Sequence, residues 1–221
     1  MLNDAPALRA FLPWAGLLVA ALAALLVAEY RRSAWGRYIA KPITSTAFVL
    51  AASAAGAMDS RYGQMLLVAL VLSWLGDVLL LSYKPLGFLA GLGAFLCGHL
   101  AFAWAFWVRG VDWTIALGVL AGLAVPGVLV GRWLLPQAPK KMRVPVAVYM
   151  TILSCMVALA SATVAAHGGA LLAVAAVMFY FSDLAVALDR FVRPGFLHRS
   201  WGLPLYYGAQ ILFASTVLSA V

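Results

Sequence analysis

Two stretches of the sequence place a single aspartate inside a long apolar segment. Residues 74–77 read Trp-Leu-Gly-Asp, and residues 180–183 read Tyr-Phe-Ser-Asp. A charged carboxylate within hydrocarbon costs about 2.5–3.5 kcal/mol on insertion scales, and such residues are typical of wet cavities and functional sites. Two of them in matching contexts predict that Asp77 and Asp183 face each other across a polar cavity.

Two carboxyl groups in a low-dielectric site suit proton-transfer chemistry. Burial and like-charge repulsion favour one neutral acid beside one ionised base, which is the arrangement used in general acid–base hydrolysis. The competing interpretation is structural, with each aspartate bonded to a neighbouring helix. The sequence contains no His-Glu-x-x-His, Cys-x-x-Cys or Gly-x-Ser-x-Gly pattern. It therefore favours neither a metal site nor a nucleophilic serine.

Polar side chains in the other apolar segments are expected at a similar membrane depth, at about 1.5 Å of rise per residue. Polar groups in membrane spans face the bundle interior, so we predict a substrate-binding set of Lys41, Thr44, His99, Tyr149, Tyr206, Tyr207 and Gln210. Simpler interpretations exist, since a histidine can bridge helices, tyrosines form interfacial belts and a lysine can extend to the membrane surface. We expect Glu29 to be interfacial, and Asp189 and Arg190 to form an exposed loop pair.

The segments that must position these groups are membrane helices. Of the 221 residues, 66% are hydrophobic and 10% charged, against roughly 45–50% and 25% in soluble domains. A span needs about 20 apolar residues. Eight such segments make one integral membrane domain over residues 1–221: residues 11–29, 40–58, 64–82, 86–108, 113–131, 144–165, 169–188 and 201–220. The predicted fold class is all-α, a polytopic bundle of eight transmembrane helices.

The net charge of +8 indicates membrane topology rather than nucleic-acid binding, because the basic residues lie in short groups between apolar segments. Twelve of the fifteen Lys and Arg residues lie in or beside the first, third, fifth and seventh connections; the other three are Arg9, Arg61 and Arg109. The positive-inside rule then places both termini outside the cytoplasm and the site toward the cytoplasmic side. We expect the membrane to be a bacterial inner (plasma) membrane.

A weak internal repeat is also present. A shift of 106 residues lays residues 74–77 on 180–183, and a shift of 111 lays residues 98–103 on 209–214. The repeat predicts two parallel four-helix halves, as in some transporters. Few positions are identical and the composition is biased, so chance similarity is the alternative.

The polar segments occur in an order that resembles a known family. They are Lys-Pro at 41–42, Gly-Asp at 76–77, Gly-His-Leu-Ala-Phe at 98–102, Tyr-Met at 149–150, residues 179–183 with Ala187 and Arg-Phe at 190–191, and Leu-Pro-Leu-Tyr-Tyr at 203–207 with Gln210. Over nearly the whole chain this order resembles the YhhN-type lysoplasmalogenase family. The resemblance implies hydrolysis of the vinyl ether bond of lysoplasmalogens to a fatty aldehyde and a glycerophospho-ethanolamine or -choline. It also implies a lysophospholipid substrate within membrane lipids, Asp77 and Asp183 as the catalytic pair, and no metal or organic cofactor.

The chemistry of the residues suits such a substrate. Protonating the β-carbon of a vinyl ether gives an oxocarbenium ion that water captures, so one carboxylic acid and one carboxylate are needed, much as in glycoside hydrolysis. Lys41 and basic loop residues are expected to hold the head-group phosphate. Two alternatives remain. One is a proton-coupled small-molecule transporter that uses the same aspartates, and the other is a lipid-binding membrane protein without turnover.

Overall fold

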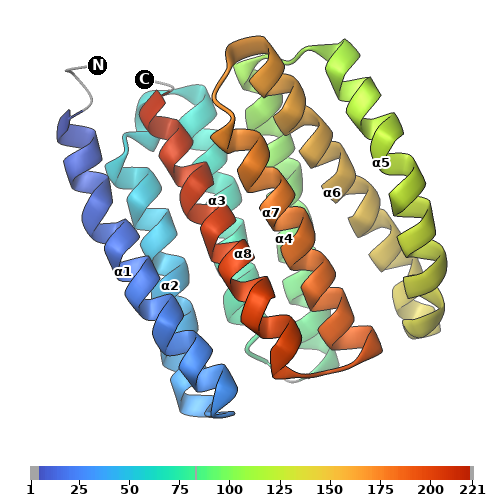
Figure 1. Cartoon of the computed structure of the whole chain (residues 1–221). Coiled ribbons are helices and arrows are strands. Elements are labelled where there is room, and N and C mark those ends of the chain that lie inside the picture. The colour runs from blue at the N-terminus through green and yellow to red at the C-terminus, as the bar shows by residue number, and fades with distance from the viewer. Residues whose placement is uncertain (1–4, 83, 220–221) are drawn as a thin grey trace.

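A computed structural model describes residues 5–82 and 84–219, and within these ranges the chain is helical without a strand. Eight α-helices follow one another in an up-and-down bundle (Figure 1). Their bounds are α1 Ala5–Tyr30, α2 Ala34–Ala54, α3 Arg61–Leu79, α4 Pro85–Arg109, α5 Trp113–Leu134, α6 Lys140–His167, α7 Leu171–Ala187 and α8 Phe196–Ser215. The all-α fold class with eight helices is confirmed.

Six of these helices are long and apolar enough to cross a membrane: α1, α3, α4, α5, α6 and α7. The chain is accordingly a multi-pass membrane protein. Helices α2 and α8 do not meet the same criterion of length and composition. Both begin with charged and polar residues, including Arg37 and Lys41 in α2 and His198 and Arg199 in α8. Their lower apolarity has a physical reason, because these two helices supply polar side chains to the interior of the bundle.

The helix starts differ from the predicted ones where a charged segment precedes an apolar one. Helix α2 begins at Ala34 rather than at residue 40, because the Ser33 side chain accepts a hydrogen bond from the Gly36 N–H at 3.1 Å and caps the first turn. Helix α8 begins at Phe196 rather than at residue 201. The apolar pattern marks only the apolar part of each helix, whereas each helix begins several residues earlier.

Each helix packs on the next, except that α4 packs on α6 rather than on α5. Helix α2 packs on α3 and α8, and α6 packs on α7 and α4. Helices α1 and α5 lie at opposite edges of the bundle, as Figure 1 shows. The centre is aromatic, with the fully buried rings of Phe102, Phe179 and Phe213 in contact with one another. A cavity lies toward the end of the bundle where α1, α3 and α7 finish.

Helices α3 and α4 approach closely beside Asp77. A Cβ placed on Gly76 would lie 2.6 Å from Cε2 of Phe95, so the ring of α4 rests directly on the glycine backbone of α3. The same occurs between α8 and α7, where a Cβ on Gly202 would lie 2.6 Å from Cβ of Ala185. Small residues at helix crossings let membrane helices pack tightly, and here they fix the helices that present the acidic side chains.

Candidate active site

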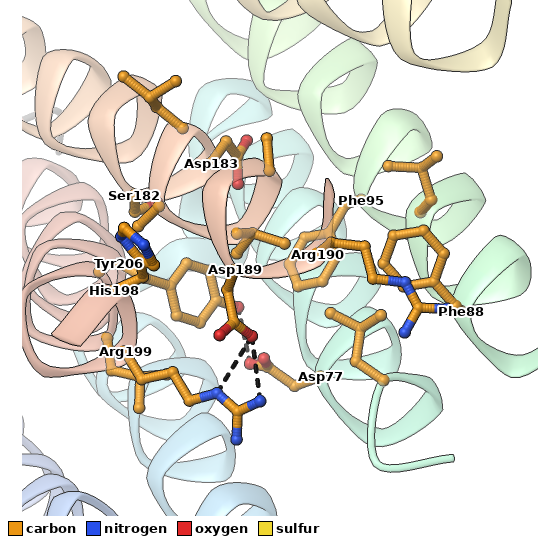
Figure 2. Close-up of a pocket in the computed structure, with 18 of the residues that line it drawn as sticks. Asp77, Phe88, Phe95, Ser182, Asp183, Asp189, Arg190, His198, Arg199 and Tyr206 are labelled. Carbon is orange, nitrogen blue, oxygen red and sulfur yellow. Dashed lines mark hydrogen bonds and ion pairs between the residues drawn. The ribbon is translucent and has the colours of Figure 1, made fainter. Parts of the chain in front are cut away.

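A single cavity of about 310 Å³ is lined by both Asp77 and Asp183. Its walls come from all eight helices and from the π-helical turn Leu188–Val192 that follows α7. Figure 2 shows both carboxyl groups among the side chains that line it, with Tyr206 and Phe95 nearby. The volume lies at the lower end of the range typical of small-molecule sites, about 300–1,000 Å³.

Asp77 is almost fully buried, at 2% exposure, and both of its oxygens have partners. Oδ1 lies 3.1 Å from Nζ of Lys41. Oδ2 accepts hydrogen bonds from the Ser45 hydroxyl at 2.6 Å and the Tyr206 hydroxyl at 2.7 Å. Two hydroxyl donors and an ammonium group stabilise the ionised form of a carboxyl group. Helices α2 and α8 thus supply these three partners of Asp77.

Asp183 has neutral partners. Its Oδ2 accepts a hydrogen bond from the Tyr149 hydroxyl at 2.8 Å and lies 3.1 Å from Nε2 of His99. Nδ1 of the fully buried His99 has no hydrogen-bond partner among the described residues. A proton on Nδ1 would bury an unpaired donor, which costs about 1–3 kcal/mol. The favoured form is therefore neutral imidazole with its proton on Nε2, which donates toward Asp183.

Aromatic rings lie between hydrogen-bond partners of the two aspartates. The ring of Phe179 lies 4.7 Å from that of His99 and 5.3 Å from that of Tyr206, measured between centroids. Phe95 contacts Tyr206 at 5.7 Å and Phe179 at 6.5 Å. The ring of Phe179 thus contacts a partner of each aspartate, His99 for Asp183 and Tyr206 for Asp77.

Charged residues form one side of the cavity. Arg199 donates to Glu29 at 2.7 Å and makes two hydrogen bonds to Asp189, at 3.0 and 3.1 Å, which Figure 2 shows as dashed lines to Asp189. Arg37 lies 3.7 Å from the same Glu29 carboxylate. Glu29 lines the cavity and is paired with arginines, and Asp189 belongs to a π-helical turn rather than a loop. The predicted loop is therefore wrong, since both Asp189 and Arg190 belong to this turn and line the cavity. Arg190 is exposed as expected, whereas Asp189 is half-buried.

Aliphatic side chains form the opposite side. Those from α4, α5 and α6 are Leu92, Val130, Leu134, Val146, Met150 and Leu153. The charged side chains come mainly from α1, α2, α8 and the π-helical turn. A cavity with one charged and one aliphatic side is typical of a binding site for an amphiphilic molecule.

The other predicted residues lie close to the cavity without lining it. The Thr44 hydroxyl donates to the Ala40 carbonyl at 2.7 Å. The Tyr207 hydroxyl lies 3.2 Å from that of Ser45 and so contacts a partner of Asp77. Gln210 is fully buried on α8, one turn beyond Tyr206. These three side chains and that of His99 are absent from the cavity walls in the described part of the chain.

Ser45 donates a hydrogen bond to Asp77, whereas the predicted residue was its neighbour Thr44. Ser45 lies four residues after Lys41 on α2, and residues spaced i,i+4 share a helix face. This spacing alone could have identified Ser45 as a neighbour of Lys41. The pairing of Arg199 with Glu29 joins residues 170 positions apart, and no local pattern marks it. Among the described residues, no group of three or more His, Cys, Asp or Glu side chains is placed to hold a metal ion.

The fold and the site define a class: a multi-pass helical membrane protein with two carboxyl groups in one amphiphilic cavity. Within that class the chain belongs to the YhhN family, whose model matches residues 36–217.

The chain is 36% identical over 155 residues to "Lysoplasmalogenase" of Mycobacterium tuberculosis (strain CDC 1551 / Oshkosh), covering 67% of this chain and 58% of that protein. It is 32% identical over 162 residues to "Lysoplasmalogenase TMEM86A" of Bos taurus, covering 70% and 64%. It is 32% identical over 159 residues to "Lysoplasmalogenase TMEM86B" of Homo sapiens, covering 71% and 65%. The matched part thus spans less than two thirds of each relative's length. No solved structure matches the chain.

Proposed function

We propose that the protein is a lysoplasmalogenase-type ether hydrolase. It cleaves the vinyl ether bond of a lysoplasmalogen to a fatty aldehyde and a glycerophospho-ethanolamine or -choline, by aspartate general acid–base catalysis. The observation that carries the proposal is one cavity with two differently partnered carboxyl groups, a charged side and an aliphatic side. Three relatives at 32–36% identity that bear the name lysoplasmalogenase support it.

The proposed reaction starts with protonation of carbon. The acid delivers its proton to the vinyl carbon farther from the ether oxygen, and the electron pair of the double bond forms the new C–H bond. The remaining carbon becomes an oxocarbenium ion, which water attacks as the base removes a proton from it. The hemiacetal then passes its hydroxyl proton to the glycerol oxygen, the C–O bond breaks, and aldehyde and alcohol leave. Return of the base's proton to the acid completes the cycle.

The contacts favour Asp183 as the acid. Its Oδ2 accepts hydrogen bonds from neutral Tyr149 and His99, whereas its Oδ1 has no partner among the described residues. A proton on Oδ1 is therefore free to pass to substrate. Asp77 is paired with the Lys41 ammonium group, which favours the ionised form. Asp77 then stabilises the oxocarbenium ion and accepts the proton from water.

The membrane arrangement is part of the proposal. We place all eight helices across the membrane as one domain, with both termini outside the cytoplasm of a bacterial inner membrane. The charged side of the cavity comes mainly from the ends of helices at the lower end of Figure 1, where the positive-inside rule puts the cytoplasm. The substrate would enter from the surrounding lipid, with its chain among the aliphatic residues of α4 to α6.

Two parallel four-helix repeats are the second architectural proposal. If α1–α4 correspond to α5–α8, the packing of α2 on α3 and α8 corresponds to that of α6 on α7 and α4. The partners of the two aspartates correspond in the same way. Asp77 on α3 has its donors on α2 and α8, and Asp183 on α7 has its donors on α6 and α4.

Turnover of a defined substrate tests the proposal. Purified protein in lipid nanodiscs is given an alkenyl glycerophosphoethanolamine, and aldehyde release is followed. We expect Asp77→Asn and Asp183→Asn each to abolish release while their melting curves stay cooperative. The matched control is Asp59→Asn, an exposed residue with no place in the cavity, which keeps wild-type activity.

Isotopes identify the bond that breaks. In D₂O the aldehyde should carry one deuterium on the carbon next to the carbonyl, and in H₂¹⁸O the glycerol product should gain no label. Label in the glycerol oxygen would mean cleavage on the other side of the ether and would refute the mechanism. Movement of protons or a solute across proteoliposomes with no aldehyde released would favour the transporter alternative instead.

A further inference from the structure

The cations along the cavity are not equivalent. Four lysine and arginine side chains line it: Arg37, Lys41, Arg190 and Arg199. Lys41 is paired with Asp77 at 3.1 Å. Arg37 and Arg199 are paired with acidic side chains of α1 and the π-helical turn at 2.7 to 3.7 Å. These three positive charges are already paired with carboxylates, so they attract an anionic ligand less strongly.

Arg190 has a different surrounding. Its Cζ lies 4.2 Å from the ring centroid of Phe88, and Figure 2 shows the guanidinium group beside that ring. Within residues 5–82 and 84–219 it makes no ion pair with a carboxylate. A guanidinium group stacked on an aromatic ring uses its flat face, so its N–H edges remain directed outward. Those edges match the oxygens of a phosphate group in a bidentate geometry.

We propose that Arg190 binds the phosphodiester group of the lysophospholipid, with Phe88 holding the guanidinium group in position. This inference rests on the proposed function, and it moves the phosphate contact from Lys41, where the sequence suggested it, to the π-helical turn. Lys41 is instead the counter-ion of Asp77. The assignment gives a role to the turn Leu188–Val192, since such insertions are frequent at functional sites.

The spacing along the helix fits the length of the substrate. Arg190 follows Asp183 by seven residues, which is about 10 Å along a helix axis at roughly 1.5 Å per residue. In an extended lysoplasmalogen, the vinyl carbon that takes the proton and the phosphorus atom are on the order of 8 Å apart, at about 1.2 Å per bond. Both residues line the same cavity. One molecule can therefore contact the acid with its vinyl ether and the arginine with its phosphate.

Binding of analogues that cannot be hydrolysed tests the inference separately from turnover. The probes are a saturated 1-O-alkyl glycerophosphoethanolamine and the matching 1-O-alkylglycerol, which lacks the phosphate. Each is titrated into nanodisc-embedded wild type, Arg190→Gln and Arg193→Gln. Arg193 is the matched control, because it is exposed, lies three residues away and does not line the cavity. We expect Arg190→Gln to weaken the phosphate-bearing probe roughly 10- to 100-fold, the range of a charge-assisted hydrogen bond, with the alkylglycerol unchanged.

Three outcomes would overturn the assignment. They are equal binding of the phosphate-bearing probe by wild type and Arg190→Gln, equal weakening of both probes by the substitution, and an Arg193→Gln effect as large as that of Arg190→Gln. If Arg190→Gln does not fold, wild type alone decides, since it should bind the phosphate-bearing probe roughly 10- to 100-fold more tightly than the alkylglycerol. Inorganic phosphate that displaces the lipid probe at equal concentration would indicate a site for the free anion and refute the lipid assignment.

Discussion

Loss of the Lys41 ammonium group is the sharpest test of the acidic centre at Asp77. In Lys41→Met the carboxylate keeps its two hydroxyl donors and loses its only paired charge. Breaking a buried ion pair on one side costs about 3–5 kcal/mol, because the other charge stays buried and uncompensated. The Lys41 side chain is 13% exposed and the two hydrogen bonds remain, so we expect the lower limit of that range, about 3 kcal/mol.

The assay is thermal unfolding in nanodiscs, followed by tryptophan fluorescence. For a chain of this size 1 kcal/mol shifts Tm by about 2–4 °C, so Lys41→Met should lower Tm by roughly 6–12 °C. Lys141→Met is the control, since this exposed lysine at the same end of the bundle makes no ion pair within the described residues. Lys41→Met/Asp77→Asn removes both charges and should recover much of the loss, with a coupling energy of about 2 kcal/mol. Additive effects of the two single substitutions would refute the pairing.

Two further predictions concern the other acid and the helix packing. Tyr149→Phe removes a hydrogen bond to a carboxyl group, worth about 1.5–3 kcal/mol, and should lower kcat/KM for aldehyde release roughly 10- to 100-fold. Tyr180→Phe is the control, because Tyr180 lines the cavity and its hydroxyl has no partner in the described part of the chain. This substitution should leave kcat/KM within about twofold. Equal losses of kcat/KM in the two variants would contradict the role of Tyr149. Gly76→Ala forces the ring of Phe95 on α4 to move and should lower the free energy of unfolding by about 1–3 kcal/mol. Gly93→Ala is the control, because its new methyl group meets open space; it should stabilise α4 by up to about 1 kcal/mol.

The sequence was sufficient to predict the eight helices and the cavity position of the two aspartates. Long apolar segments broken by glycine, proline and charge determine the number of helices, because lipid tolerates only helices or closed barrels. The aspartates were recognisable because a carboxylate in such a segment needs a partner or a wet cavity. Lys41 and Tyr206 line the cavity too, since they lie near the same end of the bundle as Asp77.

The sequence was insufficient wherever the answer depended on the direction of a side chain around its helix. Thr44 and Ser45 are adjacent and chemically alike, yet only Ser45 points to Asp77, because it shares a face with Lys41. Asp189 and Arg190 resemble loop residues because they precede Arg193 and Pro194. The π-helical turn instead widens the end of α7 and brings both onto the cavity wall. The position of a side chain along its helix can be read from sequence, whereas contacts between helices distant in the chain cannot.

The two acidic centres have the same scaffold and different partners, and this difference explains how they could divide one reaction. Each aspartate lies on one helix and accepts hydrogen bonds from side chains on two other helices. These helices correspond to one another if the two halves of the chain are repeats. In a symmetric pair of carboxyl groups, either group would carry the single proton equally well. Lys41 on one side and neutral His99 on the other break that symmetry, because the ammonium group stabilises a carboxylate and the imidazole adds no charge. Vinyl ether hydrolysis needs this inequality, since its first step consumes a proton and its second step releases one.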